Sequence, residues 1–271
     1  MLEGLRALKD TLDKRRLALA EAMSLDDFLT PQPYTVEREP FPHVVADDFF
    51  KPEQAERLNR FFYTRLADGC ADTLDYSRFH AFRNPGAGAQ SIDYDGYVYM
   101  PRPEEDASVR VLFSLAWNLF FSDLFAQPTG FATTVAFHHH PAGDHTGFVH
   151  DDHAVKAFSS RNRLANGVVP SIASQSAPGD AAGSFSGMRS IAVLYFFGGG
   201  WKEGDGGETG LYADQNAPPA KRVAPLPNRL LAFQISPRSL HAFQANKTPR
   251  DSFVQWFHTD PRWARRRYRR S

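Results

Sequence analysis

The chain has 271 residues, of which 31 are basic and 31 acidic, so its formal net charge is zero. That balance excludes a nucleic-acid-binding protein that relies on its overall charge. The single cysteine, Cys70, excludes a disulfide framework and a cysteine-rich metal site. No apolar run approaches the ~20 residues that cross a bilayer, and charged residues interrupt the stretch from Met1 to Leu25. We therefore expect a cytoplasmic protein with no membrane partner.

The N-terminal part predicts three helical segments and one strand. Residues 2–29 predict a helix with Leu5, Leu8, Leu12 and Leu19 on one face. We interpret residues 1–39 as a helical extension that packs on the domain, with a dimer contact as the alternative. The next elements in chain order are a strand at 41–50, a helix from Pro52 through Leu66, and a helix at 105–126.

From residue 131 onward the pattern changes to short strands separated by turns rich in Gly and Pro. The strands are expected at 131–138, 189–197, 209–213, 229–235, 240–245 and 252–258. Helices followed by a run of strands predict a mainly β fold with flanking helices, in which a sandwich or barrel carries the helices on its outside.

Two segments depart from this pattern. Residues 159–188, within an insert at 154–190, are rich in Ser, Ala and Gly and contain prolines. This composition predicts a mobile lid without regular secondary structure, and a disordered insertion is the alternative.

Residues 262–271 form a basic tail with six arginines around Trp263 and Tyr268. We expect a solvated tail, and contact with an anionic partner is the weaker interpretation.

The histidines indicate a metal site. Six of the ten lie between residues 138 and 153. In extended backbone, His150 and Asp152 point to the same side, so an imidazole and a carboxylate can face one metal ion. His241, at the start of a later strand, offers a second imidazole. Two histidines and one carboxylate form the facial triad that leaves three positions open on ferrous iron.

The strand after His241 adds a pair of residues suited to a carboxylate. Alternation places Arg250, Ser252, Val254 and Trp256 on one face. The planar guanidinium of arginine matches a carboxylate through two parallel hydrogen bonds, and a serine hydroxyl can add a third. The order is therefore His-x-Asp, then His, then Arg-x-Ser.

In this order the motifs resemble the Fe(II)- and 2-oxoglutarate-dependent oxygenases, most closely their prolyl-hydroxylase-like branch. The resemblance covers residues 40–261, and it rests on segments 41–50, 150–152, 191–197, 206–212, 228–233, His241 and 250–252. It implies a double-stranded β-helix (jelly-roll) domain that uses Fe(II), 2-oxoglutarate and O2. It also implies that His150, Asp152 and His241 hold the iron and that Arg250 and Ser252 bind the distal carboxylate of 2-oxoglutarate.

Two further cosubstrate contacts are implied by the same resemblance. Tyr195 falls where the family often places a tyrosine against the distal carboxylate. His140, in His140-Pro-Ala-Gly143, stands where the family has a tyrosine, and a structural role for it is the alternative. The resemblance permits either a small-molecule or a peptidyl-proline substrate. We favour a small molecule, because the insert suggests a lid and no peptide-binding repeat is present.

Specific residues argue against three other kinds of protein: a zinc site, a halogenase and a noncatalytic barrel. His150 and His153 have the spacing of a zinc pair, but no further ligands accompany them as well as the triad does. A halogenase of the same fold needs a small residue in place of Asp152. A noncatalytic metal-binding barrel has no need of the Arg250-x-Ser252 pair. The sequence carries no indication of the oligomeric state.

Overall fold

A large, mostly antiparallel sheet forms the centre of the computed structural model, which describes residues 2–67, 97–143, 146–171 and 183–268. Along its main path the strands follow the order β1-β9-β6-β11-β3-β2, with β4 added to β6 and β5 added to β3. Their bounds are β1 His43–Ala46, β2 Tyr97–Tyr99, β3 Ala132–His140, β4 Val155–Ser159, β5 Val169–Pro170, β6 Ser184–Phe196, β9 Leu230–Gln234 and β11 Arg250–Thr259.

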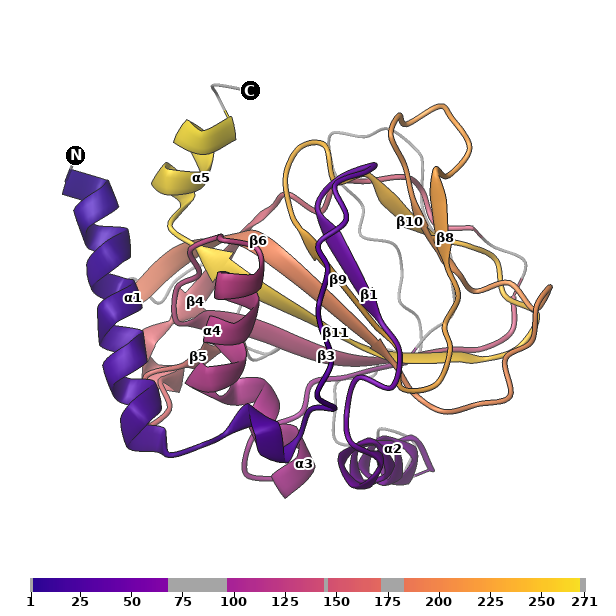
Figure 1. The fold of residues 1–271 in the computed structure, drawn as a ribbon, viewed down its shortest axis with the longest axis horizontal. Coiled ribbons are helices and arrows are strands. Elements are labelled where there is room, and N and C mark those ends of the chain that lie inside the picture. Colours follow the sequence, from indigo (N-terminus) through magenta and orange to yellow (C-terminus); the bar gives the residue numbers. More distant parts are fainter. Residues whose placement is uncertain (1, 68–96, 144–145, 172–182, 269–271) are drawn as a thin grey trace.

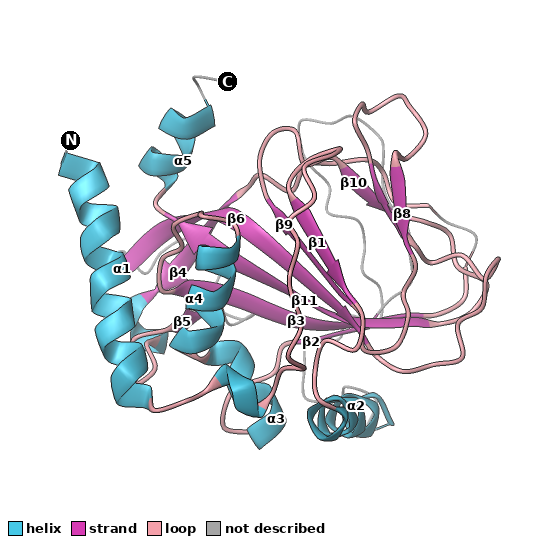
Figure 2. Ribbon diagram, viewed as in Figure 1, coloured by secondary structure: helices cyan, strands magenta, loops and turns pink. Residues whose placement is uncertain are grey.

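A second, smaller sheet faces the first. It has the order β10-β7-β8, with β7 Thr209–Leu211, β8 Lys221–Val223 and β10 His241–Phe243. In Figure 2 the second sheet lies on one side of the long strands, while helices gather on the other side. This arrangement confirms the predicted mainly β fold with flanking helices and a jelly-roll core.

Five α-helices complete the described part of the chain (Figure 1): α1 Leu2–Glu21, α2 Pro52–Ala67, α3 Ala107–Arg110, α4 Leu115–Leu124 and α5 Pro261–Tyr268. Short 3-10 segments occur at Leu25–Asp27, Val111–Phe113 and Ser160–Asn162. The helix predicted at 105–126 is thus divided, because Ser114 has an extended backbone and its side chain caps α4 by accepting from the amide of Trp117. No helix of the described residues is long and apolar enough to cross a membrane.

Strand alternation gives the large sheet two different buried faces. The outer face packs under the helices, with Phe137, Tyr195 and Phe253 in the same cluster as Trp117 of α4. The inner face packs against the second sheet, with Phe196 and Val254 among its buried residues. Even-numbered residues of β11 from Arg250 through Trp256 therefore share the inner face, as the alternation in the sequence predicted.

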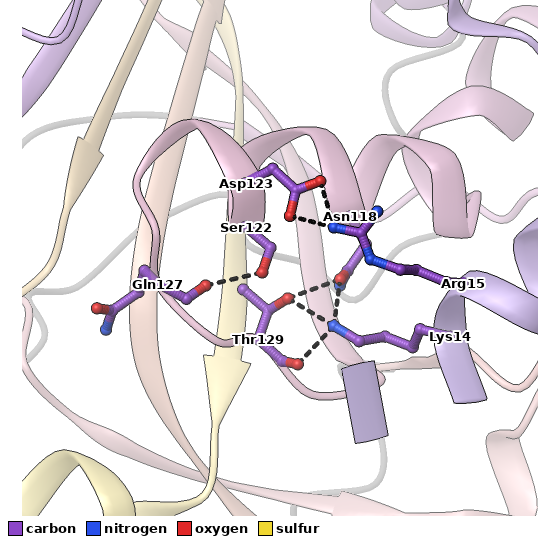
Figure 3. Close-up of polar contacts among 7 residues, drawn as sticks. All are labelled: Lys14, Arg15, Asn118, Ser122, Asp123, Gln127 and Thr129. Carbon is purple, nitrogen blue, oxygen red and sulfur yellow. Dashed lines mark hydrogen bonds and ion pairs between the residues drawn. The ribbon is translucent and has the colours of Figure 1, made fainter. Parts of the chain in front are cut away.

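Two charged side chains of helix α1 contact the domain. Lys14 is fully buried, and its ammonium donates to Asn118 Oδ1 at 2.9 Å, Thr129 Oγ1 at 2.9 Å and Thr129 O at 2.6 Å (Figure 3). Beside it, Arg15 forms a two-pronged pair with Asp123. Leu12 and Leu19 of the predicted leucine stripe are 58% and 83% exposed, so these two leucines do not pack on the domain.

Two segments expected to be irregular contain regular elements. Within the 154–190 insert, β4 pairs with the start of β6 and β5 pairs with β3, because both arms find backbone partners in the large sheet. The middle of the predicted lid, 172–182, lies outside the described residues. The basic tail begins as helix α5, which is anchored by Tyr268 donating to the carbonyl of Ile235 at 2.9 Å and by the buried Ala264.

Candidate metal and cosubstrate site

His150 and His241 lie directly opposite each other between two backbone segments. The amide of His150 donates to the carbonyl of His241 at 3.0 Å, and the amide of His241 donates back at 2.9 Å. This bridge holds the two imidazole rings 4.4 Å apart between centroids. The backbone itself therefore brings together two histidines that are 91 positions apart in the sequence.

Both rings use Nδ1 for a contact with a backbone carbonyl, which leaves Nε2 of each ring as the other nitrogen. Nδ1 of His150 lies 3.0 Å from the carbonyl of Phe148, and Nδ1 of His241 lies 2.8 Å from the carbonyl of Ser239. A carbonyl only accepts, so each Nδ1 carries the proton and each Nε2 keeps its lone pair. Burial lowers the pKa of both rings, and the neighbouring His150 lowers that of His241 further. Two neutral imidazoles, each with a lone pair on Nε2, are suitable ligands for a divalent metal.

The Asp152 carboxylate is held by other partners. The chain is not extended here, since Asp152 has a φ of 57°, a left-handed conformation that Asp tolerates. Its Oδ1 accepts from Arg189 Nη1 and its Oδ2 from Trp256 Nε1. Among the described residues, no three His, Cys, Asp or Glu side chains converge as a ready metal site. The structure therefore brings two of the three predicted ligands together and places the third in a cationic, aromatic environment.

Arg250 and Ser252 lie on the inner face beside this site. Arg250 is buried, and its Nη2 donates to Thr209 Oγ1 of the second sheet at 3.0 Å. The rings of Phe196 and Phe243 flank the guanidinium at 5.0 and 4.8 Å. The Ser252 hydroxyl is buried and has no hydrogen-bond partner among the residues that the structure describes. A guanidinium and a buried hydroxyl on one face are the donor types that bind a carboxylate.

His140 is on the same face as Arg250, since the two residues are paired across β3 and β11. Its ring is buried 5.1 Å from that of Phe243 and 5.6 Å from that of His138. Burial and the neighbouring His138 and Arg250 hold the pKa of His140 well below its usual value, so the ring is neutral. His138 is paired with Ser252 and shares its face.

Tyr195 does not lie on this face. It pairs with Phe253, so its side chain points to the outer face, where it is fully buried against Phe50 and Phe253. Its hydroxyl donates to Asn228 Oδ1 at 3.2 Å. The expected cosubstrate contact of Tyr195 is therefore wrong. The same register places Phe196, its neighbour in sequence, against the guanidinium of Arg250.

Two more residues of the site were not singled out by the sequence. Thr209, in the Gly206-to-Tyr212 motif, reaches Arg250 from the second sheet, which only the packing of the two sheets reveals. Arg189 contacts Asp152 because the pairing of β6 with β11 shifts register next to Arg189. The sequence pattern does not predict this shift.

Comparison with known proteins gives the class of the domain. Residues 135–258 match the family described as the 2OG-Fe(II) oxygenase superfamily. No curated protein matches the sequence. A prolyl hydroxylase from Trichoplax adhaerens, solved with a peptide fragment of the hypoxia inducible factor oxygen degradation domain, is 12% identical, with a TM-score of 0.51 over 90% of this chain and 91% of that one. A prolyl-4-hydroxylase of Pseudomonas putida is 14% identical, with a TM-score of 0.49 over 80% and 91% of the two chains.

At such identity the Trichoplax structure shows a shared fold, and the family match supplies the chemistry. Residues 135–258 match the 2OG-Fe(II) oxygenase superfamily, which is the class that the order of the motifs had indicated. The protein is a 2-oxoglutarate-dependent dioxygenase whose cofactor is Fe(II) and whose cosubstrates are 2-oxoglutarate and O2.

Proposed function

We propose that this dioxygenase hydroxylates an unactivated C–H bond of a small molecule, with His150, Asp152 and His241 as the iron ligands. The bridge between His150 and His241 is the observation that carries the proposal. Bound ferrous iron, with 2-oxoglutarate and O2, supplies the oxidant for hydroxylation, and succinate and CO2 are released. The protein residues orient the ligands, bind the cosubstrate and exclude water from the reacting groups.

The donor set supports an iron site. Two neutral imidazoles and one carboxylate are the ligand types of the facial triad. Each histidine is fixed by a carbonyl acceptor on Nδ1, which holds its ring plane and leaves Nε2 as the donor to metal. Asp152 contributes through one carboxylate lone pair, while Arg189 and Trp256 continue to hold its oxygens.

The cosubstrate end is built by Arg250 and Ser252. The Arg250 guanidinium donates to the two oxygens of the carboxylate, and Thr209 fixes its orientation by accepting from Nη2. Ser252 donates its buried hydroxyl to the same carboxylate, which satisfies an otherwise unpaired group. His140 lies on this face and is proposed as a further neighbour of the cosubstrate. Phe196 and Phe243 exclude water from the ion pair and strengthen it.

A protein or peptide substrate is the second candidate. The Trichoplax enzyme of the same fold was solved with a peptide fragment, so a peptidyl-prolyl hydroxylase is equally consistent with the fold. A noncatalytic metal-binding barrel is a third candidate, and the carboxylate-binding face around Arg250 argues against it.

The test measures succinate formed from 2-oxoglutarate in the presence of Fe(II) and O2. The panel consists of amino acids, other small carboxylic acids and proline-containing peptides. We expect a small molecule to stimulate succinate release and to gain one oxygen atom, while His241→Ala forms no succinate. Stimulation by peptides alone would reassign the substrate class. Absence of 2-oxoglutarate turnover with every candidate would favour the noncatalytic barrel.

A further inference from the structure

A β-bulge aims Arg189 at the proposed metal site. Along β11, Phe257 pairs with Ile191 and the next residue, His258, pairs with Arg189. Ser190 is therefore the extra residue of β6, and its hydroxyl donates to the carbonyl of Phe257 at 3.0 Å. A bulge moves the following side chains to the other face of the sheet. Without it, Arg189 would point to the outer face, away from Asp152.

The guanidinium of Arg189 is positioned as a binding group. It lies 4.2 Å from the ring centroid of Trp256 and donates to Asp152. Its side chain and that of Asp152 each keep 12% exposure, so the pair is partly accessible to solvent. Burial lowers the pKa of Arg189 to about 10, which leaves the group protonated at neutral pH. The residue is a fixed cation next to a proposed iron ligand.

A second cation lies on the same face. Lys156 of β4 pairs with Gly187 of β6, two residues before Arg189, and residues i and i+2 of a strand share a face. Gly187 confirms which face this is, because a Cβ there would meet Cβ of His258 at 2.8 Å. Burial alone lowers the pKa of Lys156, and no carboxylate of the described residues pairs with it.

Among the described residues, the acidic groups nearby would not balance these two cations if the metal were bound. Asp152 would then share its charge with the iron, and the two charges of 2-oxoglutarate would be matched by the metal and Arg250. Asp151 faces His150 and His153 and accepts from the amide of His153 at 3.0 Å. His258, which faces both cations, is neutral because burial lowers its pKa far below the usual value. Arg189 and Lys156 remain as excess positive charge.

We infer that the substrate carries a carboxylate that binds to Arg189 and is attracted by Lys156. This inference rests on the proposed function of the site and deepens it. A guanidinium held flat against Trp256 presents its remaining N–H groups in one plane, which matches the two oxygens of a carboxylate. A residue inside a peptide has no backbone carboxylate, so this geometry favours an acid-bearing small molecule such as a free amino acid over peptidyl proline.

The experiment measures binding rather than turnover. The full chain is loaded with Mn(II) and 2-oxoglutarate without O2 and titrated calorimetrically with matched pairs of compounds. Each pair is a carboxylic acid and its primary amide, drawn from the amino acids, their N-acetyl derivatives and simple aliphatic and aromatic acids. We expect at least one acid to bind roughly ten- to hundredfold more tightly than its amide, the range for a charge-assisted contact.

Variants locate the contact. Arg189→Gln should remove the preference for the acid, and Lys156→Gln should weaken acid binding roughly fivefold while it leaves metal binding unchanged, since Lys156 contacts no proposed ligand. Arg222→Gln, the same change at an exposed arginine of β8, should bind the acid like the parent protein. Because Arg189 also contacts Asp152, Mn(II) affinity is measured for each variant before the acids are added.

The outcomes separate this inference from the proposed function. If the parent protein binds neither Mn(II) nor 2-oxoglutarate, the proposed function fails. If it binds both but no acid binds better than its amide, or if Arg189→Gln and Lys156→Gln retain the preference, the carboxylate inference is overturned and the metal site stands.

Discussion

His150 and His241 are joined by a two-way backbone bridge, with amide-to-carbonyl distances of 3.0 and 2.9 Å. Main-chain bonds, and not side-chain packing, therefore set the separation of the two rings. A change of either side chain leaves the bridge in place, because the bridge uses only amide and carbonyl groups. The site thus permits a clean separation of metal binding from folding.

We predict that His241→Ala loses metal binding and keeps the fold. Truncation of this buried ring should cost about 1–3 kcal/mol of unfolding free energy, whereas Mn(II) affinity should fall by at least about a hundredfold when one of three ligands is lost. The measurements are Mn(II) titration and thermal unfolding followed by circular dichroism. His153→Ala serves as the control and should bind Mn(II) normally. Loss of metal in His153→Ala with retention in His241→Ala would support the zinc pair of His150 and His153 instead.

We predict that Arg250 sets the affinity for 2-oxoglutarate. Loss of a charge-assisted pair of about 1.5–3 kcal/mol should raise the apparent KM for the cosubstrate roughly ten- to hundredfold in Arg250→Ala. Arg250→Lys should be milder but still impaired, because an ammonium cannot reproduce the fork. Thr209→Val should show a smaller increase, since it removes only the acceptor that orients Nη2. Unchanged affinity for 2-oxoglutarate in Arg250→Ala would place the carboxylate contact elsewhere.

The residues that share the inner face of β11 could be predicted, because side chains alternate between the two faces of a strand. Alternation along β11 put Arg250, Ser252 and Trp256 on one face, and the register with β3 and β6 agrees. The same rule, applied across strands, would have excluded Tyr195, since it pairs with Phe253 on the outer face. That register depends on which residues of β6 and β11 stand opposite each other, and a single sequence does not contain this information.

The remaining features depend on irregular backbone and on tertiary contacts. The bulge at Ser190 reverses the face of Arg189, and the left-handed Asp152 turns its carboxylate away from an extended path. Neither follows from residue type. Helix α1 shows a similar limit: its leucines suggested the packing face, but acceptors on Asn118 and Thr129, more than 100 residues away in sequence, select the face that carries Lys14.

We predict that Lys14 is a main attachment point of α1. Lys14→Ala leaves the buried oxygens of Asn118 and Thr129 with fewer donors, which should cost about 1–3 kcal/mol. Lys9→Ala, the same change at an exposed position of the helix, should stay within about 0.5 kcal/mol of the parent. The measurement is the urea-unfolding free energy of both variants. Equal stability of the two variants would show that the polar cluster in Figure 3 contributes little.

We predict that the metal-free protein loses stability as the pH falls below about 6.5, and that His258 carries part of this loss. Burial, Arg189 and Lys156 lower the pKa of His258 in the folded state, whereas the unfolded chain has a value near 6.5. The unfolded state therefore binds more protons below that pH, so stability is complete above it and decreases on acidification. The pKa values of His43, His138 and His140 are also lowered by burial, that of His138 to about 4, and these residues add to the decrease.

The variant His258→Gln isolates this contribution. One buried neutral histidine should account for up to about 1.4 kcal/mol of unfolding free energy per pH unit. Between about pH 6 and pH 5 the unfolding free energy of the variant should therefore fall by up to that much less than the unfolding free energy of the parent. Urea unfolding of the parent and the variant at both values measures the difference in slope, which cancels the effect of the substitution itself. A second variant, His43→Gln, should reduce the slope in the same direction, since His43 is buried on β1 far from Arg189 in the sheet order. If His43→Gln lowers the slope and His258→Gln does not, then His258 is protonated in the folded state. In that case a negative group must accompany Arg189 and Lys156 on the inner face.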